Sequence, residues 1–323
     1  MIRVGIAGTA GELTANLIQL LVNHPDVELA WVVDPDYMQA DVSDIYRELI
    51  GDTYLHFTDT PDFKAVDVVF LSPMSWENTR EYLDKFDVPD NVRLIDFSID
   101  HPSIALENHT GPDDKPDPLT WVYGLPELMR KPLVRGARRA VVPSVVGGAL
   151  ALALLPLAKK GMLGPDVHVS AVTPLAEPGT AGETLSMVDH DAAEEVLGAV
   201  RTLQPGVNFQ TMIVETCGGW RDGLSLTAYL KLDISCDRLN QVFDEFYDDH
   251  NFITITPSLP NLNQVLGTNK CLIYLDKVGE YVAISLVMDD GMKGSAGTAV
   301  HLMNLLFGLQ ERVGLMLKPY RIH

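Results

Sequence analysis

Short, continuous apolar runs recur through the first hundred residues of this chain, and segments with helical periodicity separate them. The runs are Arg3–Ala7, Val27–Val33, Val66–Leu71 and Val92–Phe97. Between the first two, leucines spaced three or four residues apart over 13–24 predict an amphipathic helix. Strands buried on both faces, with helical crossovers between them, are typical of βαβ units. The sequence therefore predicts an open parallel sheet covered by helices.

The second half of the chain has a different pattern. Its predicted strands are Val167–Val172, Ser225–Leu232, Leu272–Leu275 and Tyr281–Val287, and its predicted helices are Asp237–Asp249 and Gly294–Gly308. This pattern predicts a second sheet, mixed or antiparallel, so the fold class is α/β with an added α+β domain. Because 323 residues exceed what one core needs, we expect two domains. Their expected bounds are 1–142, to which a C-terminal helix in 293–323 returns, and 143–292.

The balance of charge narrows the classes of partner. The chain has 24 Lys and Arg against 44 Asp and Glu, a net charge of −20. Such a field repels phosphate backbones and anionic lipid, so we expect neither nucleic acid nor a membrane surface as a partner. The apolar stretch 140–158 contains Pro143, Gly147 and Pro156, which fit a strand followed by a buried helix better than a membrane span. With no export signal before the first run, we expect a cytoplasmic protein.

The cysteines and the cationic residues indicate a function less clearly. Cys217, Cys236 and Cys271 show no paired spacing, which predicts reduced thiols and no metal site. Cationic residues are densest over 130–139, and we interpret this segment as a solvated strip rather than as an anion site.

A glycine-rich turn, VGIAGTAG, follows the first predicted strand and opens the first predicted helix, with GxxGxxG spacing. Glycines there let the backbone approach a pyrophosphate, whose charge meets amide groups and the positive end of the helix. We favour a dinucleotide site over a plain strand–helix turn. The residues assigned to it are Gly5, Gly8, Thr9, Ala10 and Gly11, together with Ser72 and Pro73, which follow the third predicted strand.

Asp34 closes the second predicted strand, where a carboxylate would bind the ribose hydroxyls of NAD. No Lys or Arg lies between Asp34 and Arg47, and Asp36 and Asp41 add negative charge that would repel a 2′-phosphate. The sequence thus favours NAD(H) over NADP(H). The alternative, that Asp34 only begins a loop, stays open.

Three motifs run in the order VYGLPEL (122–128), GTNKC (267–271) and KGSAGTAVHLMNLLFGL (293–309). With weaker matches elsewhere, the chain resembles the N-acetyl-γ-glutamyl-phosphate reductase family of the semialdehyde dehydrogenase group. This resemblance implies a Rossmann-type domain, homo-oligomers formed through the second sheet as dimers or tetramers, and an oxidoreductase of arginine biosynthesis. It also implies NADP(H) as the cofactor, with Lys293, Gly294 and Gly297 closing over the nicotinamide.

The family reduces an acyl phosphate to an aldehyde. As the resemblance implies, a cysteine thiolate expels phosphate, NADPH reduces the thioester, and a histidine manages protons. Matching the family motif ANPGC on Pro143 places Val145 at the cysteine, and a valine has no lone pair to offer. The neighbouring Ser144 is a weak nucleophile without a paired base. Of the two histidines in the family motif HxHxPE, His190 matches the first and Ala192 the second; the alternative is that His190 is a surface histidine.

Two further departures concern the cofactor: the third fingerprint glycine is Thr14, and the family's arginine for a 2′-phosphate is missing near Asp34.

Three hypotheses about the function follow. The first is an NAD(H)-dependent enzyme with altered chemistry, for which His190 is the candidate proton donor. The second is a non-catalytic ligand-binding or regulatory partner of a true reductase, with or without a cofactor. The third is a genuine reductase that uses one of the three cysteines, although a structural role is favoured for each. We rank loss or change of the thioester chemistry above its retention, for a small-molecule substrate whose identity the sequence does not give.

Overall fold

The computed structural model describes residues 1–9, 11–72, 75–101, 117–175, 180–186 and 190–319. These residues divide into two compact units. The first unit draws its described residues from 1–101, 117–143 and 295–316, and the second draws them mainly from 144–294. In this described part of the chain, no helix has the length and apolar character needed to cross a membrane.

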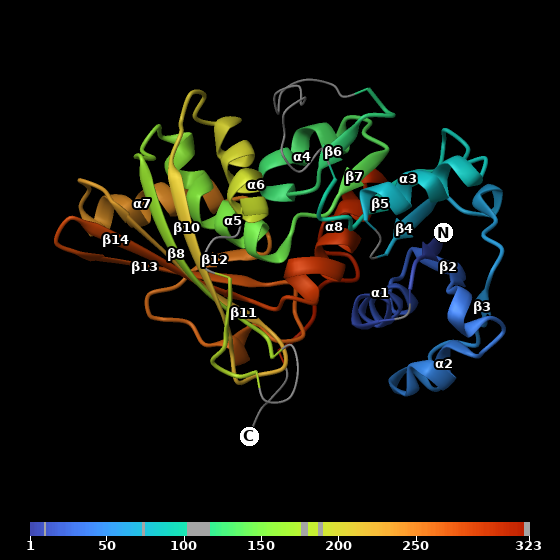
Figure 1. Ribbon diagram of the computed structural model, residues 1–323. Helices are drawn as coiled ribbons and strands as arrows, with labels where there is room; N and C mark the ends of the chain where they lie inside the picture. Colours follow the sequence, from blue (N-terminus) through green and yellow to red (C-terminus); the bar gives the residue numbers. More distant parts are fainter. Residues whose placement is uncertain (10, 73–74, 102–116, 176–179, 187–189, 320–323) are drawn as a thin grey trace. The chain divides into compact units, whose positions relative to one another are not determined.

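The first unit is built on a parallel sheet, in which the described strands run in the order β3–β2–β1–β4–β5–β7–β6 (Figure 1). Every neighbouring pair is parallel, as the apolar runs predict. The order reverses between β1 and β4, and in open sheets of this kind ligands bind at the carboxyl ends of the strands beside such a reversal. The strands are β1 Ile2–Ala7, β2 Val27–Val33, β3 Phe57–Thr58, β4 Val68–Leu71, β5 Arg93–Asp96, β6 Trp121–Tyr123 and β7 Arg139–Val141.

Helices of the first unit come from both ends of the chain. The α-helices are α1 Glu12–Val22, α2 Val42–Ile45, α3 Trp76–Lys85, α4 Pro126–Val134 and α8 Gly297–Leu306, and the 3₁₀ turns are η1 Pro35–Tyr37, η2 Arg47–Leu49 and η3 Phe63–Ala65. The last of the α-helices, α8, is buried along its whole length and contacts α1, α4 and β5. The prediction that a C-terminal helix returns to the first sheet is confirmed.

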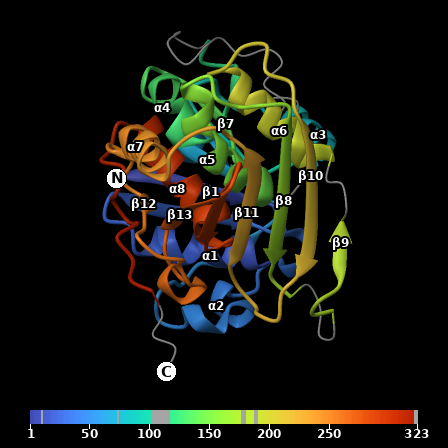
Figure 2. The ribbon, with the colours of Figure 1, turned by 90° about the vertical axis from the view of Figure 1, so that its left-hand side faces the viewer.

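The second unit is built on a mixed sheet, with its described strands in the order β12–β13–β14–β11–β8–β10–β9 (Figure 2). The pairs β8–β10 and β12–β13 are parallel and the rest are antiparallel. The strands are β8 Asp166–Thr173, β9 Thr184–Ser186, β10 Gln210–Cys217, β11 Leu224–Lys231, β12 Ile253–Ile255, β13 Cys271–Val278 and β14 Tyr281–Met288. The strand β10 was not predicted because, of its eight residues, only Ile213 and Cys217 are buried, so it has no apolar run.

Three helices cover one face of this mixed sheet: α5 Val145–Lys159, α6 His190–Arg201 and α7 Cys236–Tyr247. Of these, α5 contacts β11 and β14, α6 contacts β10, and α7 contacts β12 and β13. Every residue of α5 from Val146 to Ala158 is buried, which explains the long apolar stretch in the sequence without a membrane.

The prediction of a helix from Gly294 was wrong at its start. Residues Met292–Ala296 form a π-helical turn after β14, and the α-helix begins only at Gly297. Turns of this kind are rare and occur often at functional sites.

Candidate functional site

The glycine turn joins β1 to α1 at the reversal of strand order. Ser72, directly after β4, donates its backbone N–H to the carbonyl of Ala7 at 2.7 Å. A Cβ on Gly8 would lie 2.4 Å from the Ser72 carbonyl oxygen, and a Cβ on Gly5 would lie 2.3 Å from the Trp31 indole. Close packing therefore requires glycine at both positions, and it brings Gly8 and Ser72 together at the carboxyl ends of β1 and β4.

Gly11 has a different environment. Among the described residues, apart from its chain neighbours, no atom lies within 4 Å of the position that a Cβ on Gly11 would take. It is the N-cap residue of α1 and offers no capping side chain. Behind it, the hydroxyl of Thr14 donates to the Thr9 carbonyl at 2.9 Å and lies 3.0 Å from the Ser72 hydroxyl. An open glycine at an uncapped helix N-terminus fits the pyrophosphate of a dinucleotide.

Tyr46 contacts this turn from 35 residues away. The backbone N–H of Gly11 donates to the Tyr46 hydroxyl at 2.9 Å, and the hydroxyl donates to the Gly11 carbonyl at 3.2 Å. Nothing in the sequence pattern identifies Tyr46, because its role depends on how the segment after β2 folds back against α1. Ala10 and Pro73, assigned to the same site, lie outside the described residues.

Asp34 stands at the carboxyl end of β2, the neighbour of β1, and is the N-cap of η1. Its Oδ1 accepts the backbone N–H of Asp36 at 2.8 Å, and the residue is 1% exposed. Asp34 thus begins a loop, and it does so where a ribose-binding carboxylate is expected; its role in ribose binding stays a prediction. Burial, more than the charge of Asp34, raises the pKa of Tyr46.

The start of α5 is the second point of interest. Val145 is its first residue, and the hydroxyl of the N-cap Ser144 accepts the backbone N–H of Gly147 at 3.0 Å. Ser144 donates its hydroxyl to Oε2 of Glu195 at 2.5 Å and its N–H to Oε1 at 3.2 Å. Glu195 belongs to α6 and is 1% exposed, whereas His190 is exposed at the first residue of that helix. Of these two residues, only His190 was predicted as a site residue, although Glu195 stands at the last position of the same motif.

Val145 also contacts the π-helical turn, because a Cβ on Gly294 would lie 3.1 Å from Val145 Cγ1. Asp289 holds this turn: its carbonyl accepts the N–H of Gly294 at 2.9 Å, and its Oδ1 accepts the N–H of Met292 at 2.8 Å. Its other carboxylate oxygen accepts the N–H of Gly267 at 2.6 Å. Burial raises the pKa of Asp289 to about 6. The segments GTNKC and KGSAG are therefore joined beside position 145, and Lys293 is buried within the second of them.

The three cysteines differ in their exposure. Cys217 and Cys271 are buried, and Cys236 is exposed on α7. The thiol of Cys217 donates to the Pro174 carbonyl at 3.2 Å. Within the described residues, no group of three His, Cys, Asp or Glu could hold a metal ion.

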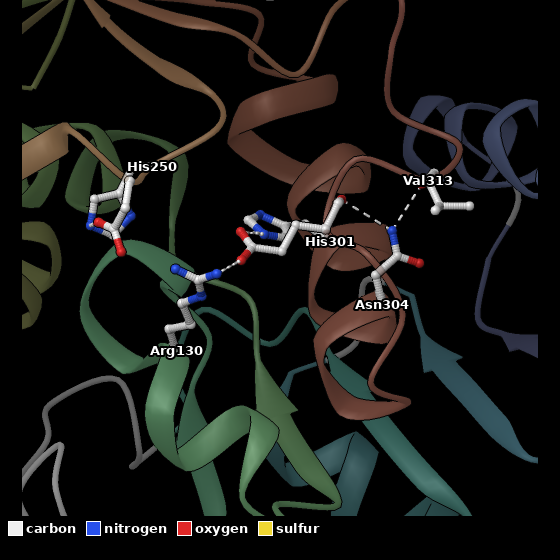
Figure 3. Close-up of polar contacts among 7 residues, drawn as sticks. Arg130, His250, His301, Asn304 and Val313 are labelled. Atoms are coloured by element: carbon white, nitrogen blue, oxygen red, sulfur yellow. Dashed lines mark hydrogen bonds and ion pairs between the residues drawn. The ribbon is translucent and has the colours of Figure 1, made fainter.

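The cationic segment 130–139, which starts within α4, contributes to the fold of the first unit. Arg130 pairs with Glu311, whose other carboxylate oxygen lies 2.9 Å from Nε2 of His301 (Figure 3). Asn304, also on α8, donates to the Val313 carbonyl at 2.8 Å. The Arg130 side chain is 42% exposed, as expected for part of a solvated strip, although its partner carboxylate is 9% exposed.

Comparison with known proteins identifies the family. A profile described as "Semialdehyde dehydrogenase, NAD binding domain" matches residues 3–135, and one described as "Semialdehyde dehydrogenase, dimerisation domain" matches residues 147–290. The N-acetyl-gamma-glutamyl-phosphate reductase of Parabacteroides distasonis is 35% identical, over 99% of each chain. The chain belongs to the N-acetyl-gamma-glutamyl-phosphate reductase family of semialdehyde dehydrogenases. A reductase of the same name from Christiangramia forsetii is 32% identical, over 98% of this chain and 99% of its own.

Solved structures agree on the fold. Aspartate semialdehyde dehydrogenase II from Vibrio cholerae has a TM-score of 0.71 at 10% identity, covering 95% of this chain and 99% of its own. A probable aspartate-semialdehyde dehydrogenase from Pseudomonas aeruginosa has a TM-score of 0.68 at 16% identity, covering 95% and 98%. The resemblance drawn from the motifs and the fold class are confirmed, and the profile over the first unit supports a nicotinamide cofactor.

Proposed function

We propose that this protein is a dinucleotide-binding member of its family in which the thioester chemistry has been lost. The observation that carries the proposal is Val145, the first residue of α5, at the position where the family motif has its cysteine. The isopropyl side chain cannot attack an acyl carbon or carry a thioester. It is half-buried and packs against the π-helical turn at Gly294.

Among the described neighbours of Val145, no group supports a substitute nucleophile. Ser144 accepts the Gly147 amide and donates to Glu195, so its hydroxyl serves the start of α5. A serine nucleophile also needs a base that takes its proton near neutral pH, and a carboxylate is a weak one. Hydride transfer without a thiol would still need a proton donor. His190 is the only candidate from the sequence, and its exposed place on α6 gives no support to that role, which favours a ligand-binding function.

The dinucleotide would bind across the carboxyl ends of β1 and β4, with its pyrophosphate over Gly11 and the N-terminus of α1. When bound, the nicotinamide supplies or accepts a hydride. Asp34 and Asp36 give the end of β2 negative charge, which supports NAD(H) over NADP(H). From the family resemblance, Lys293, Gly294 and Gly297 are the residues proposed to lie near the nicotinamide.

Titration with NADH and NADPH, followed by nucleotide fluorescence, tests this proposal. Gly11→Ala should weaken NADH binding, because the added methyl group enters the space proposed for the pyrophosphate. Gly164→Ala is the matched control, since a Cβ there also meets no described atom within 4 Å and its φ is not positive. Tighter binding of NADPH than of NADH would overturn the argument from Asp34. Absence of binding to either nucleotide would overturn the dinucleotide site.

We further propose that the second unit forms a homodimer through the face of its sheet opposite the helices. Along β11, Leu224, Leu226, Ala228 and Leu230 are buried. The residues between them face the other way, and among them Thr227 lies 3.0 Å from the Ser285 hydroxyl of β14. This half-exposed, uncharged surface lies in the part of the chain that matches the family's dimerisation domain.

A further inference from the structure

We infer that Tyr46 is an internal cap on the dinucleotide site. Its hydroxyl accepts the hydrogen bond of the Gly11 N–H, which would otherwise go to a pyrophosphate oxygen, and the hydroxyl therefore weakens dinucleotide binding. This inference rests on the proposed function, in which the glycine turn binds a dinucleotide. It makes Tyr46 a determinant of affinity that the glycine pattern does not contain.

The geometry of the contact shows that the hydroxyl bonds both backbone polar groups of one residue, Gly11. It accepts from the Gly11 N–H at 2.9 Å and donates to the Gly11 carbonyl at 3.2 Å. An amide has a single proton and makes one strong hydrogen bond. A phosphate oxygen can therefore use this amide only when the hydroxyl gives it up. Because burial raises the pKa of Tyr46, the hydroxyl keeps its proton at neutral pH and remains able to donate.

Tyr46 is held in place rather than free to swing aside. It lies between α2 and η2, and its backbone N–H donates to the Val42 carbonyl at 2.9 Å. Its ring centroid is 6.3 Å from that of Phe57, a buried residue of β3, and Tyr46 itself is 7% exposed. Displacement of the hydroxyl would leave a buried polar group in need of new partners, and such a group costs free energy.

The contact also lies at the point where the chain favours a phosphate. Gly11 is open on its Cβ side, precedes the N-terminus of α1, and follows β1 at the reversal of strand order. Anions are stabilised at such a terminus by amide groups and by the helix dipole. A tyrosine hydroxyl there offers a weaker, neutral acceptor than a phosphate oxygen, and the two compete for the same donor.

Tyr46→Phe tests the inference because it removes the hydroxyl and keeps the ring against Phe57. NADH titration should give a dissociation constant about three- to tenfold lower than for the wild type, the range expected for one hydrogen bond. Tyr54→Phe is the matched control: it removes a hydroxyl from the same segment at a residue that is 89% exposed, and should leave the constant unchanged. A thermal melt of each variant establishes that it is folded.

An equal or higher dissociation constant for Tyr46→Phe overturns the cap while the proposed function stands. If neither the wild type nor Tyr46→Phe binds NADH, both the cap and the proposed function fail. A second measurement uses the wild type alone. Saturating NADH should move the amide proton resonance of Gly11, because its acceptor changes from a hydroxyl to a phosphate, and a resonance that stays in place contradicts the inference.

Discussion

Asp96 is a buried carboxylate at the end of β5, in the first unit. Its Oδ1 accepts the N–H of Ser98 at 3.2 Å and the Ser98 hydroxyl at 2.9 Å, and the residue is fully buried. Burial raises its pKa to about 6, as it does for Asp289. Between about pH 4 and pH 6, the native protein therefore keeps protons that the unfolded chain has released. Stability contributed by these groups falls as the pH rises through that window and is level above it.

We predict that Asp96→Asn reduces this pH dependence. The asparagine side chain keeps an oxygen that can accept from Ser98, and it does not titrate. Only the contribution of Asp289 to the pH dependence therefore remains. Between pH 4 and pH 6, the free energy of unfolding should fall with rising pH in both proteins. The slope of the wild type should be steeper than that of the variant by about 1.4 kcal/mol per pH unit. Urea unfolding at several pH values measures both slopes. Equal slopes would show that Asp96 is ionised throughout the range.

At the scale of elements, a buried carboxylate ties one helix to the first turn of another. Glu195 of α6 accepts two hydrogen bonds from Ser144, the N-cap of α5, and a Cβ on Gly147 would lie 2.3 Å from its Oε2. Glycine at position 147 therefore leaves room for the carboxylate that packs on it. The bond between Ser144 and Glu195 fixes where α5 begins, and with it the position of Val145.

Glu195→Gln should destabilise the second unit by about 1–3 kcal/mol, because a charged acceptor of two hydrogen bonds becomes a neutral amide with a donor facing the Ser144 hydroxyl. Glu194→Gln is the control, since Glu194 is the exposed neighbour on the same helix and carries the same change of charge. Thermal and urea unfolding of both variants measure the difference. Equal stability of the two would mean that the Ser144 contact contributes nothing.

Which elements the sequence predicts depends on how locally they are determined. The strands β1, β2, β4 and β5 were predicted because their apolar runs are buried on both faces, and α5 because turn-forming residues precede it. The strand β10 was missed because its pairing with β8, not its composition, makes it a strand. Tyr46 could not be predicted, because it contacts a residue 35 positions away through a single hydroxyl. Glu195 stands in a family motif, but its contact with Ser144, 51 positions away, is visible only in the structure.

At the scale of the whole molecule, the open face of the second sheet predicts self-association. Sedimentation of the wild type should give a dimer or a multiple of it, and Thr227→Arg should shift it toward the monomer, because an arginine at a half-buried position of β11 places a charge in the proposed interface. Lys231→Arg, at the exposed end of the same strand, is the control. A wild type that sediments as a monomer at all concentrations would contradict the proposed homodimer.

The proposed loss of thioester chemistry is tested most directly by a reductase assay in the reverse direction. Purified protein is given N-acetylglutamate semialdehyde, phosphate and either NAD⁺ or NADP⁺, before and after treatment with iodoacetamide. Because Val145 stands at the position proposed for the nucleophile and two of the three cysteines are buried, we predict no phosphate-dependent formation of NADH or NADPH in any arm. Turnover that alkylation abolishes would show that a thiol of this chain still reaches the substrate, and the account of a lost nucleophile would be wrong.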